Sequence, residues 1–194
     1  KTILNTHPFQ YGRWSFAHNG NIKDFQNKRD KLLKLVHIDL KGFLMGDTDS
    51  EMIFYIILSQ LLMDNIVKGD VSTDMYEKSI RKAIKNIMDI SGQYYSDPTG
   101  PDTENYYSFL MTNGRSMFAF HGGKELFYST YKTKCPERDT CPKLSPECEA
   151  PTNSGYVNHL LFSSEPLSGE NVWDKMKPAE MIIIDTNMVF KRYF

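Results

Sequence analysis

A change in hydrophobic periodicity halfway along the chain most constrains its fold. From about Ile22 to Ile90, apolar residues recur at helical spacing, whereas from Tyr106 onwards they alternate with polar residues as they do in strands. One early strand, predicted at Tyr11–Ala17, precedes the helices. Because helices inserted between an early strand and a later run of antiparallel strands can cover sheets, the pattern predicts an α+β fold.

Three helices are predicted in the middle of the chain. The first runs from Ile22 or Lys23 to about Leu35. The second begins with a capping box, Thr48-Asp49-Ser50-Glu51, and its continuation over 52–63 is apolar on nearly every side, which is typical of a helix buried in the interior. The third spans about Thr73–Ile90, and its apolar stripe consists of Ile80, Ala83, Ile84, Ile87 and Ile90.

Further strands are predicted in the second half of the chain. They are Tyr106–Thr112, Ser116–His121, Glu125–Thr130, Tyr156–Ser163, Met181–Asp185 and Met188–Phe190. Asn113-Gly114 separates the first two of these strands and is typical of a hairpin turn. Another Asn-Gly pair lies in His18-Asn19-Gly20, which we expect to form a tight turn because Asn-Gly tolerates positive φ angles. Residues 1–10 are expected to form an extended entry segment.

Length and composition fit a single domain with a sizeable core. The chain has 194 residues, of which 40% are hydrophobic and 13% aromatic, so disorder is not expected. Lys and Arg number 23 against 24 Asp and Glu, and so small a net charge gives no electrostatic basis for binding nucleic acid. The longest apolar run, near Met52–Met63, is too short to span a bilayer. We expect a cytoplasmic protein with no membrane partner.

All three cysteines lie in one proline-rich, charged stretch, Lys134–Pro151. The spacing of Cys135, Cys141 and Cys148 does not match the close pairs that are usual in zinc sites, and an odd count argues against a disulfide framework. A variable surface loop in a reducing compartment is the simpler interpretation. No metal and no cofactor is therefore expected.

Two short motifs carry groups that could take part in catalysis. Asn19-Gly20 places a side-chain amide beside a glycine N–H, and these are the donors that an oxyanion hole requires, although a plain turn explains the pair equally well. Asp49 could bind a substrate ammonium or simply complement the helix dipole. Asp47 and Asp49 form an Asp-x-Asp pair that could hold Mg²⁺. His7 could bind substrate or be structural.

Four motifs, in this order, resemble those of the class II glutamine amidotransferases, which belong to the N-terminal-nucleophile hydrolases. They are His7-Pro8, His18-Asn19-Gly20, Thr48-Asp49-Ser50-Glu51, and Phe162-Ser163-Ser164-Glu165-Pro166-Leu167 followed by Trp173. The last motif resembles a Ser-Glu-Pro-Leu stretch of one branch. That branch includes proteins that hydrolyse γ-glutamyl bonds in glutathione breakdown and in ergothioneine synthesis. The resemblance runs from Asn5 to about Met181.

The resemblance implies a four-layer αββα sandwich, in which two antiparallel sheets lie between helices. It also implies hydrolysis of the γ-carboxamide of glutamine or of a γ-glutamyl compound through a cysteine acyl-enzyme. In the family, a cysteine at the mature N-terminus attacks the amide, and its own α-amine acts as the base. Transferred to this chain, Asn19 and Gly20 would form the oxyanion hole, and Asp49 and His7 would bind substrate, with Asp49 holding the α-ammonium.

The nucleophilic cysteine and the arginine that binds the substrate α-carboxylate should both precede Asn5 and are not in this chain. Cys135, Cys141 and Cys148 cannot replace the nucleophile because none has a free α-amine. We therefore expect a single amidotransferase domain over residues 1–194 that lacks its N-terminal portion, supplied by the same polypeptide or by a companion chain. As it stands, the chain could not perform the reaction.

Two alternatives of other classes stay open. A scaffold or regulatory subunit of the same fold would need no catalytic groups, whereas Asn19 and Asp49 are what an enzyme would retain. A Mg²⁺-dependent transferase that uses Asp47 and Asp49 would need a glycine loop to bind phosphate, and Gly122-Gly123 is too little for that.

Overall fold

Two antiparallel sheets and a layer of helices form the computed structural model, which describes residues 5–68 and 71–194. In spatial order, the larger sheet consists of β1 (Phe9–Tyr11), β2 (Trp14–Asn21), β3 (Tyr106–Thr112), β4 (Met117–Phe120), β9 (Met181–Ile184), β10 (Val189–Tyr193) and β6 (Gly155–Tyr156). The smaller sheet consists of β7 (Leu161–Ser163), β5 (Phe127–Lys132) and β8 (Asn171–Lys175). The predicted α+β fold with two antiparallel sheets is confirmed.

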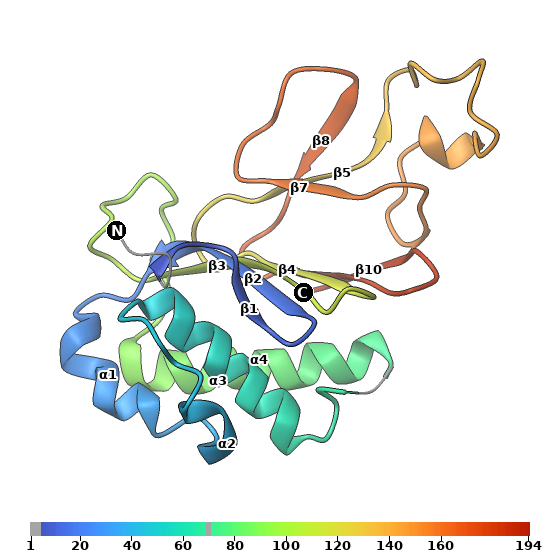
Figure 1. Ribbon diagram of the computed structural model, residues 1–194. Coiled ribbons are helices and arrows are strands. Elements are labelled where there is room, and N and C mark those ends of the chain that lie inside the picture. Colours follow the sequence, from blue (N-terminus) through green and yellow to red (C-terminus); the bar gives the residue numbers. More distant parts are fainter. Residues whose placement is uncertain (1–4, 69–70) are drawn as a thin grey trace.

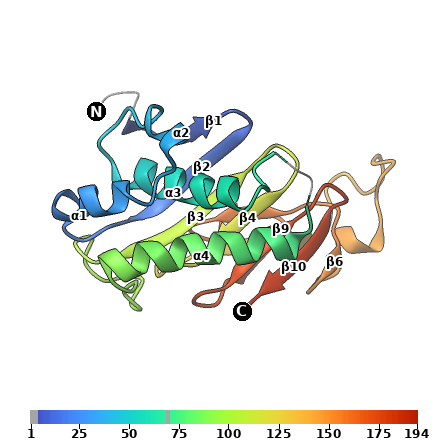
Figure 2. The ribbon, with the colours of Figure 1, turned by 90° about the horizontal axis from the view of Figure 1, so that it is seen from below.

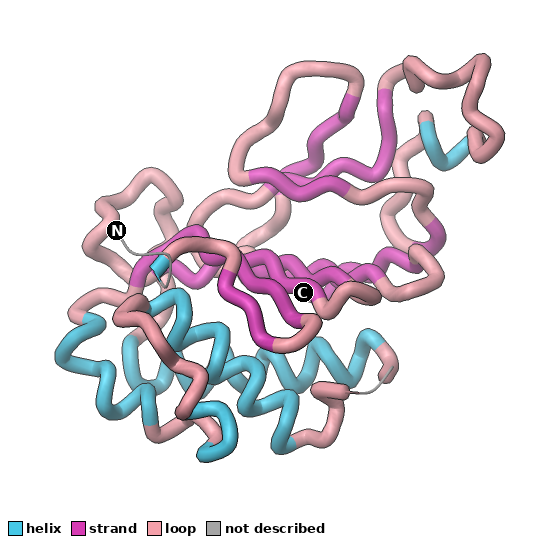
Figure 3. The backbone as a smooth tube through the Cα atoms, viewed as in Figure 1, coloured by secondary structure: helices cyan, strands magenta, loops and turns pink. Residues whose placement is uncertain are grey.

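The helices lie on one face of the larger sheet, and the smaller sheet lies on its other face (Figure 1). They are α1 (Phe25–Leu33), α2 (Ile38–Lys41), α3 (Asp49–Met63) and α4 (Thr73–Ser91). Figure 2 shows α4 running across the larger sheet beneath β3, β4 and β9. The connections around the smaller sheet are mostly loop (Figure 3), and they include a short 3₁₀ helix at Pro146–Cys148.

Helix α3 is the centre of the helical layer, and its local sequence explains where it begins. Thr48 Oγ1 accepts a hydrogen bond from the Glu51 N–H (3.2 Å), as expected for an N-cap. The Glu51 carboxylate, however, does not close the predicted capping box, because its two oxygens accept the N–H groups of Met45 (2.9 Å) and Gly46 (2.8 Å). Glu51 thus fastens the preceding loop to the helix. From Ser50 to Leu61 every residue of α3 is buried, so the predicted burial of Met52–Met63 holds except at the end of the helix, where Met63 is exposed.

Aromatic rings connect α3 to the sheet. The Phe16 ring of β2 stacks on that of Phe54 in α3 and lies against that of Phe109 in β3, at 5.3 Å between ring centroids in both cases. All three side chains are almost fully buried. Burying each of these side chains contributes about 1.5–3 kcal/mol to folding. The packing of the three rings therefore helps to hold the helical layer against β2.

A second core fills the space between the sheets. Its buried members are Ala119, Leu126, Tyr128, Val157, Met176, Ile182, Ile184 and Phe190. The alternation of β9 explains this arrangement, since Ile182 faces this core whereas Met181 and Ile183 face the helices. The sheet is therefore buried on both faces.

The prediction that His18-Asn19-Gly20 forms a tight turn is wrong. These residues belong to β2, which continues to Asn21 and pairs with β3 as far as Tyr106. A long-range pairing partner, supplied almost ninety positions later, overrides the local turn preference of Asn-Gly. The other Asn-Gly pair does form the predicted hairpin turn, with Gly114 at φ +78°.

The prediction of one strand over Tyr156–Ser163 is also wrong. Gly155–Tyr156 pairs with β10 in the larger sheet, whereas Leu161–Ser163 pairs with β5 in the smaller one. The chain changes sheets between them, with Val157 buried in the second core. Three elements, β1, β8 and α2, were not predicted; of these, β1 and α2 have only three and four residues. Of the predicted entry segment, residues 1–4 lie outside the described residues.

The cysteine-containing loop leaves the smaller sheet after β5. Cys135 is buried, and Cys141 and Cys148 are half-buried, with all three thiols free. The Cys148 Sγ accepts a hydrogen bond from Asn158 Nδ2 (3.1 Å), which ties the loop to the chain between the two sheets. Among the described residues, every helix is too short or too polar to cross a membrane.

Candidate active site

Asn19 and Gly20 lie near the end of β2, beside β3. Asn19 pairs with Ser108, and Gly20 pairs with Tyr107. The neighbouring His18 ring points towards the helices, where it contacts α3. Because successive side chains of a strand point to opposite faces, the Asn19 side chain is directed towards the smaller sheet. There it is exposed and lines a cavity of about 500 Å³.

The backbone N–H of Gly20 points away from β3. On the partner strand, the Tyr107 N–H donates to the Gly122 carbonyl oxygen (2.7 Å), so the backbone polar groups of Tyr107 face β4. Opposite residues of an antiparallel pair turn their polar groups either towards each other or away from each other. The Gly20 N–H therefore points to the far edge of β2, past Phe16, where the pairing with β1 stops.

Only glycine fits at position 20. A Cβ there would lie 2.1 Å from the Tyr106 carbonyl oxygen and 2.5 Å from His18 Nε2. Both neighbours are fixed, because the same ring nitrogen and carbonyl oxygen are bonded to each other at 2.9 Å. The close approach of β2 and β3 at this point therefore sets the residue type.

Asp49, the first residue of α3, binds the chain that leaves β2. Its Oδ2 accepts the Ile22 N–H (2.6 Å), and its Oδ1 accepts the N–H of Ser50 (2.7 Å). Ile22 lies only two residues beyond Gly20, so Asp49 and the glycine N–H belong to one small region. A carboxylate offers about four acceptor positions, which leaves room for a further donor such as an ammonium group.

The His18 ring joins β2 to α3. It is 8% exposed, and its Nε2 donates to the Tyr106 carbonyl oxygen (2.9 Å), which fixes the tautomer because a carbonyl can only accept. Its Nδ1 then accepts from the Ser50 Oγ (2.9 Å). Burial lowers the pKa of His18, against the opposing charge of Asp49. No role of this ring was predicted, because its partners come from distant elements.

His7 lies in the same region, before β1. Its ring packs edge-on against that of Phe9 (5.0 Å between centroids). Burial lowers the pKa of His7, and the negative charge of Asp49 partly opposes this shift. The structure thus brings His7, His18 and Asp49 together, whereas the Asn19 side chain lies on the opposite face of the sheet, in a cavity whose lining includes neither Gly20 nor Asp49.

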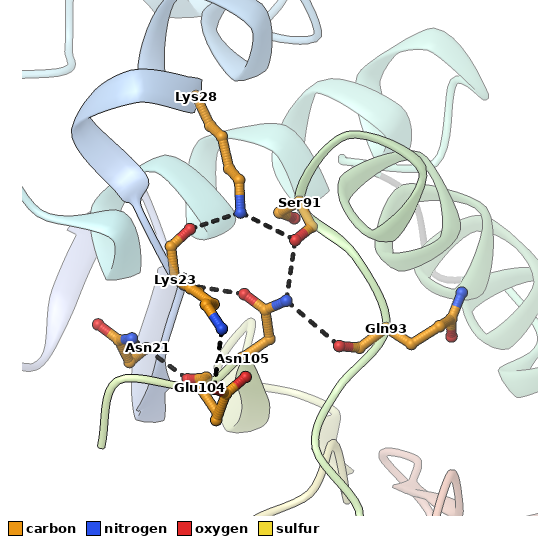
Figure 4. A network of polar contacts seen from close by, with 7 residues as sticks. All are labelled: Asn21, Lys23, Lys28, Ser91, Gln93, Glu104 and Asn105. Atoms are coloured by element: carbon orange, nitrogen blue, oxygen red, sulfur yellow. Dashed lines mark hydrogen bonds and ion pairs between the residues drawn. The ribbon is translucent and has the colours of Figure 1, made fainter. Parts of the chain in front are cut away.

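A polar network holds the chain immediately after β2 (Figure 4). The Asn105 side-chain oxygen accepts the Lys23 N–H (2.8 Å), and its amide nitrogen donates to the carbonyl oxygens of Ser91 (2.8 Å) and Gln93 (3.2 Å). The Lys28 ammonium donates to the carbonyl oxygens of Lys23 (2.5 Å) and Ser91 (3.0 Å). The network therefore fixes this chain against the C-terminal end of α4.

The fourth motif reaches the same cavity as Asn19. Phe162, Ser163 and Ser164, at the end of β7, line it opposite β2. Further along, the Trp173 indole N–H donates to the Leu167 carbonyl oxygen (3.0 Å) and closes the loop between β7 and β8. The motif thus forms one wall of the space between the two sheets.

No described contact links the Asp47 carboxylate to Asn19, Gly20 or Asp49. Asp47 is exposed, and its N–H donates to Asn5 Oδ1 (3.1 Å). Within residues 5–68 and 71–194, no group of three or more His, Cys, Asp or Glu side chains is placed to hold a metal ion. The oxygens of Asp49 are instead directed at backbone N–H groups.

Comparison with known proteins identifies a family for almost the whole chain. The sequence model of the family described as glutamine amidotransferases class-II matches residues 1–191. A Saccharomyces cerevisiae protein named "Probable glutamine amidotransferase DUG3" is 33% identical over 116 residues, which cover 58% of this chain and 32% of that protein. The chain thus spans about a third of the length of this relative.

Two solved structures share the fold. A glutamine aminotransferase class-II domain protein from Silicibacter pomeroyi matches with a TM-score of 0.62 and 21% identity, over 99% of this chain and 71% of that chain. A predicted glutamine amidotransferase from Pseudomonas aeruginosa matches with a TM-score of 0.57 and 20% identity, over 96% and 65% of the respective chains. The arrangement of layers is therefore one that these proteins also adopt.

Proposed function

Since this chain belongs to the class II glutamine amidotransferases, we propose that its natural full-length protein hydrolyses the γ-amide of glutamine or of a γ-glutamyl compound. The observation that carries the proposal is the meeting of two kinds of group at the end of β2. The Gly20 N–H points to the edge of β2. Two residues further along the chain, the Ile22 N–H binds the Asp49 carboxylate. One group suits an oxyanion and the other an ammonium.

The proposed reaction assigns a role to each of these groups. A cysteine outside this sequence attacks the γ-carbonyl carbon, and its α-amine takes the thiol proton. The Asn19 side-chain amide and the Gly20 N–H stabilise the negative oxygen of the tetrahedral intermediate. The amine then leaves with the proton, and water hydrolyses the thioester to release glutamate. Asp49 holds the substrate α-ammonium throughout, with His7 beside it.

The substrate is proposed to be a γ-glutamyl compound on the strength of the motif that ends β7. Phe162, Ser163 and Ser164 line the cavity into which Asn19 projects. Their resemblance to the branch that hydrolyses γ-glutamyl bonds supports this narrower assignment. We further propose that the protein acts in the cytoplasm without a cofactor, and that the missing segment is its own N-terminal portion or a companion chain.

A non-catalytic scaffold is the second candidate, and two contacts of Asp49 favour it. Asp49 already has a structural role, because both of its oxygens accept backbone N–H groups. A Mg²⁺-dependent transferase has less support, since Asp47 is exposed and the Asp49 oxygens are directed at the backbone. The three candidates predict different effects of removing the Asp47 and Asp49 carboxylates on activity.

Comparison of Asp49→Asn with Asp47→Asn in the full-length protein tests the proposal. If Asp49 binds the substrate ammonium, its loss costs about 2–5 kcal/mol, or roughly a 30- to 5,000-fold fall in kcat/KM for γ-glutamyl hydrolysis. Asp47→Asn, the matched control, should leave kcat/KM and Tm unchanged. A transferase activity that EDTA inhibits and that both substitutions reduce equally would support the Mg²⁺-dependent transferase. Full specific activity of folded Asp49→Asn would show that Asp49 is structural and would contradict its role in binding the ammonium. Absence of hydrolysis in the folded wild-type protein would support the scaffold.

A further inference from the structure

The side chain of Asn105 is buried, and all of its hydrogen-bonding groups bond to backbone atoms. It is 7% exposed and directly precedes β3. Its oxygen and both amide hydrogens are used, in the contacts with Lys23, Ser91 and Gln93 drawn in Figure 4. We propose that Asn105 is a positioning residue, which holds Asn19 and Gly20 in place for the reaction; this inference rests on the proposed function.

Three consecutive residues before and at the start of β3 hold the end of β2. The Glu104 carbonyl oxygen accepts from the Asn21 side-chain amide (3.2 Å), and the Tyr106 carbonyl oxygen accepts from the His18 ring (2.9 Å). Asn105 lies between them and takes the Lys23 N–H through its side chain. Asn19 and Gly20 are therefore fixed on both sides, at positions 18, 21 and 23.

The contact at Lys23 also bears on Asp49. Ile22, the residue before Lys23, donates its N–H to Asp49 Oδ2 at 2.6 Å. A shift of the Lys23 backbone would move Ile22 as well, and with it the spacing between the Gly20 N–H and the carboxylate. Asn105 therefore controls the geometry of both groups, although no described contact joins its side chain to any of them.

Asn105 acts through the anchoring of α4 as well. Its amide nitrogen and the Lys28 ammonium donate to the same Ser91 carbonyl oxygen at the end of that helix. Lys28 also donates to the Lys23 carbonyl oxygen, so both backbone polar groups of Lys23 are held. This anchoring gives the end of β2 little freedom to move, which is what oxyanion donors require.

The other end of β3 provides a matched control. Asn113 is also buried, at 1% exposed, and directly follows β3. Its oxygen accepts the N–H groups of Arg115 (3.0 Å) and Ser116 (2.7 Å), and its amide donates to the Tyr76 hydroxyl (3.2 Å). Asn105→Ala and Asn113→Ala thus remove the same kind of side chain from opposite ends of one strand.

The test measures Tm, kcat and KM for γ-glutamyl hydrolysis by both variants of the full-length protein. Both should lower Tm. Only Asn105→Ala should lower kcat, on the order of 10- to 100-fold, because misplacement of a reacting group by about 1 Å has an effect of this size. KM should change less than about threefold, since no substrate contact is removed. Equal kcat values in the two variants, with wild-type activity present, would overturn the inference.

Absence of activity in the wild-type protein would instead contradict the proposed function, so the two failures are distinguishable. If Asn105→Ala does not fold, Lys28→Met provides the second variant. It keeps an aliphatic stem but loses the donor to the Lys23 and Ser91 carbonyl oxygens. A fall in kcat of about threefold or more at unchanged KM supports the inference, and an unchanged kcat overturns it.

Discussion

At the scale of single residues, the end of β2 is defined by close contacts rather than by local turn preference. The His18 ring, the Tyr106 carbonyl oxygen and Gly20 lie so near one another that no side chain fits at position 20. The His18 ring also reaches Ser50 beside Asp49. The residues proposed for the oxyanion and the ammonium are therefore tied together by a neutral imidazole.

Substitution of Gly20 by alanine tests this packing. In Gly20→Ala the Cβ would meet the Tyr106 oxygen at 2.1 Å, so the two strands must separate. We expect a loss of about 1–3 kcal/mol or more in the free energy of unfolding. The control is Gly42→Ala, because Gly42 has a helical φ of −69° and open space around it, and alanine there should be neutral or stabilising. Equal urea midpoints for the two variants would contradict the account.

At the scale of elements, the loop before α3 depends on Glu51 more than on the N-cap. Glu51 is almost fully buried and accepts the N–H groups of Met45 and Gly46. Glu51→Ala should therefore cost about 3 kcal/mol, since a buried donor at Gly46 and a partly buried one at Met45 lose a charged acceptor. Thr48→Ala should cost only about 1 kcal/mol. Denaturant unfolding of both variants measures the difference, and a larger loss in Thr48→Ala would show the order to be wrong.

The same elements show which parts of the fold can be predicted from sequence. The start and burial of α3 were predictable because a cap and a continuous apolar run are local features. The strand character of His18–Asn21 was not, because it depends on pairing with β3 far along the chain. The division of 155–163 between two sheets likewise follows from tertiary packing. The motifs singled out the candidate residues, whereas the contacts of His18 and Asn105 required the structure.

At the scale of the whole molecule, four histidines with lowered pKa values should make stability depend on pH. Burial lowers the pKa of His7, His18, His121 and His159. In the unfolded chain their pKa returns to about 6.5, so below that pH the unfolded state binds more protons. Stability is then fully present above about pH 6.5 and falls as the pH decreases.

The measurement is the Tm between pH 7.5 and pH 5.5. We expect a clear decrease over this interval. Carboxylates with lowered pKa, such as Asp64, lose their contribution only at lower pH, so they do not account for it. A Tm that stays constant or rises as the pH falls from 7.5 to 5.5 would contradict the assignment of these histidines as neutral in the folded protein.

The kinetics of Asn19→Ala test the central claim, that the end of β2 stabilises an oxyanion, most directly. Asn19 is exposed, so its truncation should leave Tm unchanged. In the full-length protein, kcat for glutamate release should fall roughly 10²- to 10³-fold, the loss expected for one oxyanion donor. Asn187→Ala, which removes an exposed asparagine from the β9–β10 turn, should keep the wild-type kcat. A folded Asn19→Ala protein with the wild-type kcat would contradict the account.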